Sequence, residues 1–172
     1  MKLHLRYYGD PVLRRRASEV RVFDEQLRKE ADAMVDAMVY ESGVGLAAPQ
    51  VGIEKRLLVA LQMETPDDSE AEPLVMVNAE IVGRSPETWV FEEGCLSIPG
   101  IRGDVTRPER ITVRYHDVDG TSHMIDIEGM FARVVQHEID HLDGKLFIDY
   151  LSMGERTLLK PRLKKIAEKY VS

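Results

Sequence analysis

The sequence of 172 residues predicts an α+β fold in which the sheets are mainly antiparallel. Strand-like segments fill the middle of the chain, and helical patterns lie near both ends. An Asp-Gly turn joins two alternating segments, as in a hairpin of antiparallel strands. Because the length fits one domain of ordinary size, we expect residues 1–172 to form a single domain.

The first helix is expected over residues 24–42. Asp24 stands where a side chain can cap the first turn, and Gly43 stands where helices commonly end. The apolar residues between them recur at spacings of three and four, the period of a helix face that packs on a core. These residues are Leu27, Ala31, Met34, Val35 and Met38.

Four segments in the middle of the chain have the composition or the alternation of strands. They are RLLVALQ from Arg56, LVMVNAEIVG from Leu74, ITVRYHDV from Ile111 and TSHMIDIE from Thr121. Asp119 and Gly120 lie between the last two, which form the expected hairpin. Five carboxylates without a basic residue lie between Glu64 and Pro73, and we expect this segment to be a solvated loop between strands.

Two more helices are expected towards the carboxyl end. Residues 130–142 carry apolar side chains on helical spacing, and Gly144 stands just past them as a cap. This helix carries a histidine motif, and we expect the antiparallel sheets to pack around it. A last amphipathic helix is expected from Pro161 to Val171.

Composition and charge exclude several classes of protein. With 23 basic and 30 acidic residues the net charge is −7, which argues against nucleic acid as a specific partner. The longest uncharged segment considered, residues 43–53, has eleven residues and is too short to span a bilayer. Cys95 is the single cysteine, which excludes a disulfide within the chain and fits a reducing compartment. The first ten residues lack the apolar region of a secretory signal, so we expect a cytoplasmic protein.

His137, Glu138 and His141 form an H-E-x-x-H pattern on the second expected helix. At about 100° per residue, the two histidines lie about 40° apart around the helix axis and face the same way. They can therefore occupy two coordination positions of one metal ion. Glu138 stands beside them, where it can handle protons rather than bind the ion.

A catalytic metal site needs a third protein ligand and one open position. The extended motif of one metalloprotease class asks for histidine at position 147, which is Phe147 here. A downstream glutamate would have to be Glu155 or Glu168. Cys95 is the remaining soft donor, in a segment marked by glycine and proline, although a lone cysteine is more often a small buried apolar residue.

A third segment, GVGLAAPQ from Gly43 to Gln50, leaves the backbone approachable because its residues are small. Gln50 adds an amide that can donate a hydrogen bond to a developing oxyanion. The segment is not a dinucleotide-binding motif, because its glycines follow a helix rather than a strand and the third glycine is missing.

These segments resemble the three signature motifs of the peptide deformylase family in order and in spacing. The motifs are GVGLAAPQ from Gly43, EGCLS from Glu93 and QHEIDH from Gln136. The similarity extends through GDPVLRRRA near the amino terminus and HLDGKLFIDYLS after the helix, so it covers most of the chain. The acidic run falls where the family varies in length.

The resemblance implies a ligand set and a reaction. Cys95, His137 and His141 would bind one divalent metal, which is Fe(II) as the usual physiological ion of the family; zinc, nickel and cobalt also suit these donors. The implied reaction is hydrolysis of the formyl group from the N-formylmethionine of nascent peptides, which releases formate.

The resemblance also implies roles for other residues. Glu138 would act as the general base and then the general acid. The Gln50 amide and the backbone N–H of Leu96 would stabilise the oxyanion. Gly45 would bind the peptide backbone, Val44 and Val134 would line the methionine pocket, and Arg102 would touch the peptide.

Two other functions are compatible with the histidine motif. A zinc peptidase would need its third ligand downstream, whereas Cys95 lies upstream. A metal-stabilised binding module would need a fourth protein ligand, and no second cysteine exists to supply it. Residues 160–170 carry a net charge of +4, so we also expect either a solvated helix face or weak docking to the anionic ribosome.

Overall fold

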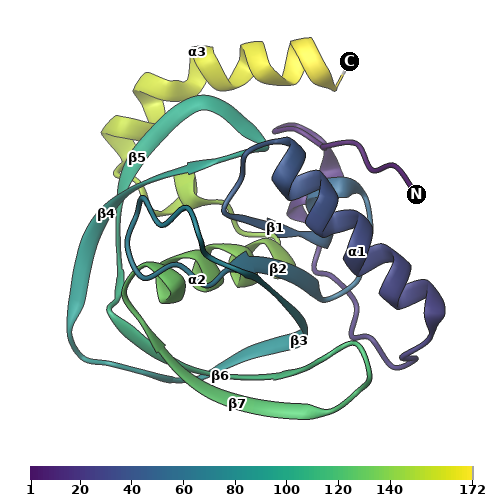
Figure 1. The fold of residues 1–172 in the computed structure, drawn as a ribbon. Coiled ribbons are helices and arrows are strands. Elements are labelled where there is room, and N and C mark those ends of the chain that lie inside the picture. The colour runs from purple at the N-terminus through teal and green to yellow at the C-terminus, as the bar shows by residue number, and fades with distance from the viewer. Residues whose placement is uncertain (172) are drawn as a thin grey trace.

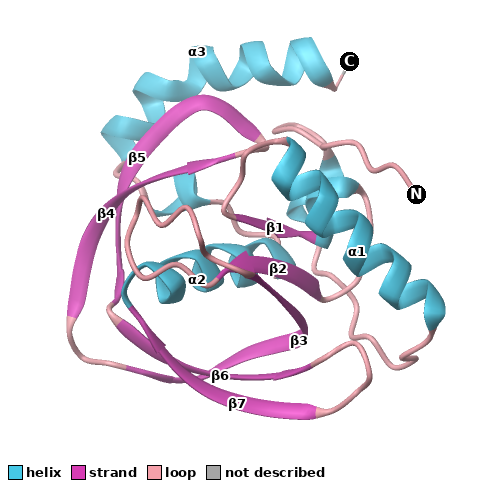
Figure 2. Cartoon of the chain, in the orientation of Figure 1, coloured by secondary structure: helices cyan, strands magenta, loops and turns pink. Residues whose placement is uncertain are grey.

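The computed structural model describes residues 1–171, and its strands form two antiparallel sheets (Figures 1 and 2). The five-stranded sheet has the order β1 (Gly45–Ala47), β2 (Leu57–Leu61), β3 (Pro73–Arg84), β6 (Arg110–His116) and β7 (Ser122–Glu128). The second sheet is the pair β4 (Thr88–Cys95) and β5 (Ile98–Pro108). Every pair of named strands is antiparallel, which confirms the predicted α+β class.

The helix α2 (Gly129–Leu142) lies in the interior, with strands around it in Figure 1. One face packs on the five-stranded sheet, where Val135 and Leu142 share a core with Leu58 and Met76. Because apolar burial contributes about 25 cal/mol per Å², this packing fixes the orientation of the opposite, histidine-bearing face. The expected central helix that carries the H-E-x-x-H motif is therefore present.

The helix α1 (Glu25–Tyr40) covers a second core. Asp24 caps it as expected, accepting a hydrogen bond of 3.0 Å from the backbone N–H of Leu27. Leu27, Met34 and Met38 are fully buried against β1 and β2 residues. This packing holds β1, an edge strand, beside α2.

The pair β4–β5 did not appear among the strands expected from sequence. Glycine and proline interrupt its pattern, which favours turns when local sequence alone is considered. At Gly103 a Cβ atom would lie 2.7 Å from Leu151 Cδ2, so this glycine allows β5 to approach the buried Leu151 side chain closely. Tertiary contacts thus allow a strand that local preference does not predict.

The helix α3 (Met153–Tyr170) begins eight residues before the expected start at Pro161. Ser152 caps it by accepting a hydrogen bond from the N–H of Glu155, and the Glu155 carboxylate accepts one back from the Ser152 hydroxyl. Met153 and Leu158 are exposed, so the first turns carry no buried apolar pattern. The predicted start was wrong because the hydrophobic period is visible only after Pro161, which lies inside the helix.

Two other expectations concern the surface. The acidic segment from Glu64 to Pro73 connects β2 to β3, and four of its five carboxylates are exposed while that of Asp68 is half-buried, as expected for a solvated loop. Within residues 1–171, the helices are too short or too polar to cross a membrane.

Candidate active site

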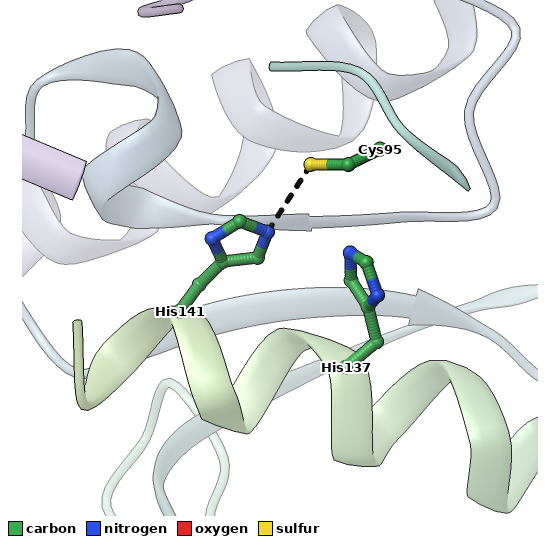
Figure 3. Close-up of side chains that lie close together, drawn as sticks. All are labelled: Cys95, His137 and His141. Atoms are coloured by element: carbon green, nitrogen blue, oxygen red, sulfur yellow. Dashed lines mark hydrogen bonds between the residues drawn. The ribbon is translucent and has the colours of Figure 1, made fainter. Parts of the chain in front are cut away.

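Three potential metal ligands converge where β4 meets α2. Cys95 is the last residue of β4, and His137 and His141 project from one face of α2 towards it (Figure 3). The Cys95 Sγ atom lies 3.4 Å from His141 Nε2, and one ligand atom from each residue lies within 4.8 Å of the others. Among the described residues, no fourth side chain of the usual ligand types joins this group.

The donor set and its spacing fit a divalent transition metal. Metal–sulfur and metal–nitrogen bonds of about 2.3 and 2.1 Å at a tetrahedral angle give a sulfur–nitrogen separation of about 3.6 Å, close to the observed 3.4 Å. His137 Nδ1 is engaged by Glu93 at 2.9 Å, which leaves Nε2 for the metal. Although burial lowers it, the Glu138 carboxylate and the Cys95 sulfur raise the pKa of His137 well above its ordinary value. Burial and the charge of His137 hold the pKa of His141 well below its ordinary value, so positive charge is stabilised at the His137 ring and not at His141.

Glu138 lies next to the ligands in an enclosed position. Its Oε1 atom is buried without a hydrogen-bond partner among the described residues. Burial raises the pKa of Glu138 to about 7, so this carboxyl group can accept and return a proton near neutral pH. A Cβ atom at Gly45 would lie 2.5 Å from Glu138 Oε2, so only glycine leaves room for the carboxylate there.

Gln50 directs its side-chain amide towards the cluster of potential metal ligands. It lies in the 3₁₀ turn Ala48–Val51, and its Oε1 atom accepts a hydrogen bond of 2.9 Å from the N–H of Ala47. Its Nε2 atom lies 3.1 Å from Ser97 Oγ and 3.5 Å from Cys95 Sγ. Because the carbonyl side is fixed by the backbone, the donor side of the amide faces the cluster.

These groups border one cavity of about 590 Å³. Its lining includes nine of the ten site residues expected from sequence: Val44, Gly45, Gln50, Cys95, Leu96, Arg102, Val134, His137 and Glu138. His141 is the exception, because it is buried behind Cys95 and meets the cavity only through the cluster. Leu96 lies in the turn between β4 and β5, and Arg102 folds over Gly94 in an exposed ion pair with Glu92 at 3.0 Å.

Similar proteins identify the family. A model of the polypeptide deformylase family matches residues 2–157. The peptide deformylase of Thermotoga neapolitana is 46% identical over 164 residues, which cover 95% of this chain and 96% of that protein. That of Rhizobium meliloti is 46% identical over 159 residues, covering 92% and 90%. The chain belongs to the peptide deformylase family.

Solved structures of deformylases agree with this assignment. A plant peptide deformylase superposes with a TM-score of 0.90 at 37% identity, covering 98% of this chain and 90% of that one. The peptide deformylase of Thermotoga maritima superposes with a TM-score of 0.82 at 45% identity, covering 88% and 99%. The resemblance inferred from the three motifs is therefore confirmed.

A buried ionic network supports the deformylase site and was missed by sequence analysis. Glu93 Oε1 holds His137 Nδ1 at 2.9 Å, while Glu93 Oε2 lies 2.6 Å from Arg107 Nε and 2.7 Å from one terminal nitrogen of Arg133. Arg107 also binds Asp140, 2.8 Å away on α2. Although burial raises it, hydrogen bonds from Arg107 and His137 hold the pKa of Glu93 well below its ordinary value.

This network connects the two parts that supply the ligands. Glu93 is on β4 two residues before Cys95, and Arg133 is on α2 one turn before His137. The only signal in the sequence was the position of Glu93 inside the EGCLS motif. Arg107 and Arg133 gave no local signal, because arginine is rarely buried and their shared partner Glu93 lies on a different element from either of them.

Proposed function

We propose that this chain hydrolyses the N-formyl group of N-formylmethionyl nascent peptides to formate and a free amino terminus. The observation that carries the proposal is that Cys95, His137 and Glu138 border the same cavity, with His141 completing the ligand set. Peptide deformylases are metal-dependent enzymes, and the chain covers nearly the whole length of its relatives.

In this proposal Cys95, His137 and His141 hold one divalent cation, which supplies a Lewis acid and lowers the pKa of water in the site. Fe(II) is the proposed physiological ion, and zinc, nickel or cobalt can replace it in the isolated protein, because one thiolate and two imidazoles suit all four. Metal analysis of protein purified without oxygen tests this choice, and stoichiometric zinc in protein from iron-replete cells would contradict it.

Glu138 is the proposed proton carrier. Its carboxylate takes a proton from the attacking water, and the resulting acid gives that proton to the departing amine nitrogen as the bond from the formyl carbon to nitrogen breaks. Burial supports this assignment, because a carboxyl group with a pKa of about 7 both accepts and donates near neutral pH.

Gln50 and Leu96 are the proposed donors to the oxyanion. Negative charge develops on the formyl oxygen during attack, and the fixed Gln50 amide can donate to it without reorganisation. The backbone N–H of Leu96, in the turn after Cys95, is the second proposed donor. Losing one such donor typically costs about 3–4 kcal/mol of transition-state stabilisation.

The peptide is proposed to bind along β1. This edge strand pairs with β2 on one side only, so Gly45 can hydrogen-bond an extended substrate in the manner of an added strand. Val134 and Val44 are the proposed apolar contacts of the methionine side chain, and Arg102 is the proposed contact of the following backbone.

Formate release tests the whole proposal. Protein loaded with Fe(II) without oxygen should release formate from formyl-Met-Ala and should leave the unformylated peptide bond intact. Cleavage of an unformylated peptide would indicate a metallopeptidase instead. Metal binding without either reaction would indicate a binding module. The variant Glu138→Gln, which keeps the shape of the side chain, is the matched inactive control.

Residues 1–172 are proposed to act as one catalytic domain in the cytoplasm, where ribosomes make the formylated substrates. The helix α3 is proposed to dock weakly on ribosomal RNA, because its exposed lysines give this end of an acidic protein a local positive charge. The remaining surface carries a net negative charge, so no specific nucleic-acid site is proposed.

A further inference from the structure

The segment that leads into the GDPVLRRRA motif hydrogen-bonds to two of the three signature motifs. The backbone N–H of Arg6 donates to the carbonyl of Gln50, in the first motif, at 2.7 Å. The backbone N–H of Tyr8 donates to the carbonyl of Ser97, in the second motif, at 2.9 Å. Residues 6–17, which we call the amino-terminal strap, therefore connect these two motifs.

The other end of the strap is fixed to α2 and to the segment after it. The N–H of Ala17 donates to the carbonyl of Leu142, 2.8 Å away in the last turn of α2. The Arg14 guanidinium binds both carboxylate oxygens of Asp149, at 2.7 and 3.1 Å. The strap is therefore anchored at both ends, and a displacement relative to the metal-binding helix would have to break these contacts.

On its outer side the strap lies against α3. The Tyr7 ring stacks on that of Tyr170 with centroids 3.8 Å apart and planes inclined by 14°, and both rings border the active-site cavity. A Cβ atom at Gly9, whose φ of +102° suits glycine, would lie 2.8 Å from the Cβ of Ala167. The strap is therefore enclosed between α3 and the signature motifs.

The two motif contacts of the strap act on one functional group, the side-chain amide of Gln50. Arg6 holds the Gln50 backbone directly, and its guanidinium packs on Gly52, where a Cβ atom would lie 2.9 Å from Arg6 Nη2. Tyr8 holds Ser97, whose fully buried hydroxyl accepts a hydrogen bond of 3.1 Å from Gln50 Nε2. The strap therefore fixes both the backbone that carries the amide and the acceptor that orients its donor end.

We propose that Arg6 and Tyr8 are positioning residues, which hold the Gln50 amide where it can donate to the oxyanion. Such a donor is effective only if it is aimed at the developing charge before reaction, and a misplacement of about 1 Å can cost about 10²-fold in rate. The 3₁₀ turn that carries Gln50 has only four residues, so contacts from outside the turn are needed to hold it at this precision. The inference rests on the proposed function, in which Gln50 is a donor to the oxyanion.

Replacing one backbone N–H of the strap with an ester oxygen removes a single hydrogen bond and leaves every side chain in place. The ester at Arg6, introduced by translation with the matching α-hydroxy acid, should lower kcat for formyl-Met-Ala by about 10- to 100-fold. KM and metal content should stay unchanged, because the oxyanion forms only in the transition state. The ester at Tyr8 should act in the same way.

An ester at Ser18 is the matched control. The N–H of Ser18 donates to the carbonyl of Glu54 at 2.9 Å, and neither residue lines the cavity. Thermal unfolding should show a similar loss of stability in the Ser18 and Arg6 esters, whereas only the Arg6 ester should lower kcat. A kcat that falls equally in both would mean that the effect is general destabilisation and would overturn the proposal.

A double-substitution cycle with Gln50 separates positioning from a structural role. Gln50→Ala should lower kcat by about 10²- to 10³-fold. In that variant the Arg6 ester should change kcat by less than about twofold, because the amide that it positions is gone. Equal effects of the ester with and without the Gln50 amide would overturn the proposal, and so would the parent kcat in both the Arg6 and the Tyr8 ester.

A spectroscopic measurement tests the strap without turnover. In protein loaded with diamagnetic Zn(II), the Gln50 side-chain amide gives a pair of nitrogen-correlated proton resonances, which are assigned by their absence from Gln50→Ala. The Arg6 ester should shift or broaden this pair, and the Ser18 ester should not. If the pair responds but the parent releases no formate, the proposed function fails and the positioning of Gln50 by the strap stands. An unresponsive pair in a protein that releases formate overturns the strap alone.

Discussion

The helices α2 and α3 differ sharply in how they are held. Eleven of the 14 residues of α2 are buried, including the polar residues Arg133, His137, Glu138 and His141 of the site. Only two of the 18 residues of α3, Leu163 and Ile166, are buried. A buried helix fixes both its apolar and its polar side chains, whereas a helix held by one narrow stripe can carry surface functions at little cost to stability.

The comparison of α2 with α3 indicates which side chains must be held in a fixed position. On α2, each polar side chain of the site is oriented by a partner or by packing, as the contact of His137 with Glu93 illustrates. On α3, the lysines face water and Tyr170 contributes to the cavity only at its rim. Substitutions on α2 and its partners should therefore change metal binding and chemistry, and substitutions at the exposed lysines of α3 should change only recognition.

The largest effect is expected at the ligand supplied by β4. Cys95→Ala should lose both metal and formate release, because two histidines alone leave the ion weakly held. Cys95→Asp should keep a divalent metal with poorer activity, since a carboxylate binds but alters the charge and softness of the site. Metal content and formate release are measured on the same samples. Full metal content and activity in Cys95→Ala would mean that Cys95 is only a buried apolar residue.

Glu138→Ala should keep the metal and lose turnover by about 10²- to 10⁴-fold, the usual contribution of a positioned acid–base group. The fold should be retained, because Glu138 Oε1 makes no hydrogen bond whose loss would cost stability. Metal analysis checks the metal content, thermal unfolding checks the fold, and single-turnover kinetics check the loss of turnover. Loss of metal together with activity would instead show that Glu138 is a ligand or a structural residue.

Glu93→Gln should weaken metal binding by about 10- to 100-fold, as expected when the partner of a ligating histidine is changed. It should also lower the free energy of unfolding by about 3–5 kcal/mol, because two buried arginines lose a charged partner. Competition with a chelator and urea unfolding measure the two effects. Metal affinity equal to that of the parent would mean that Glu93 does not orient His137.

The same variant predicts a pH dependence. Because the pKa of Glu93 in the folded protein is depressed below its ordinary value of 4.5, its contribution is complete above that value and is lost as the pH falls below it. The stability difference between the parent and Glu93→Gln should therefore be constant near neutral pH and should shrink on acidification below about 4.5. A difference that grows in acid would contradict this linkage.

The smallest effect on the folded protein is expected on α3. Replacing Lys160, Lys164, Lys165 and Lys169 by glutamate should change the free energy of unfolding by no more than about 0.5 kcal/mol per site, because these side chains are exposed. Activity on formyl-Met-Ala should stay unchanged. Co-sedimentation with ribosomes at low salt should be lost, and equal sedimentation of the parent and the variant would contradict the docking proposal.

Features that depend on one continuous segment could be predicted from sequence, whereas features that depend on contacts between distant segments could not. The helix α2 was predicted because apolar period, motif and cap agree over one continuous segment. The ligand set needed the family resemblance, because sequence spacing alone left Cys95 in competition with Glu155 and Glu168. The strands β4 and β5 and the two buried arginines that contact Glu93 were not predicted. They are stabilised by contacts with residues far away in the chain, which local sequence patterns do not reveal.

The contact of Gly9 with Ala167, beside the stack of Tyr7 on Tyr170, also constrains the order of folding. These residues lie almost a full chain length apart, so closing the loop between them is entropically the most expensive step of its kind in the fold. The stretch from β4 to α2, which includes all three ligands, is synthesised before α3, which begins after ten further residues. During its own synthesis, the protein can therefore assemble the metal-binding core first and complete the rim of the cavity last.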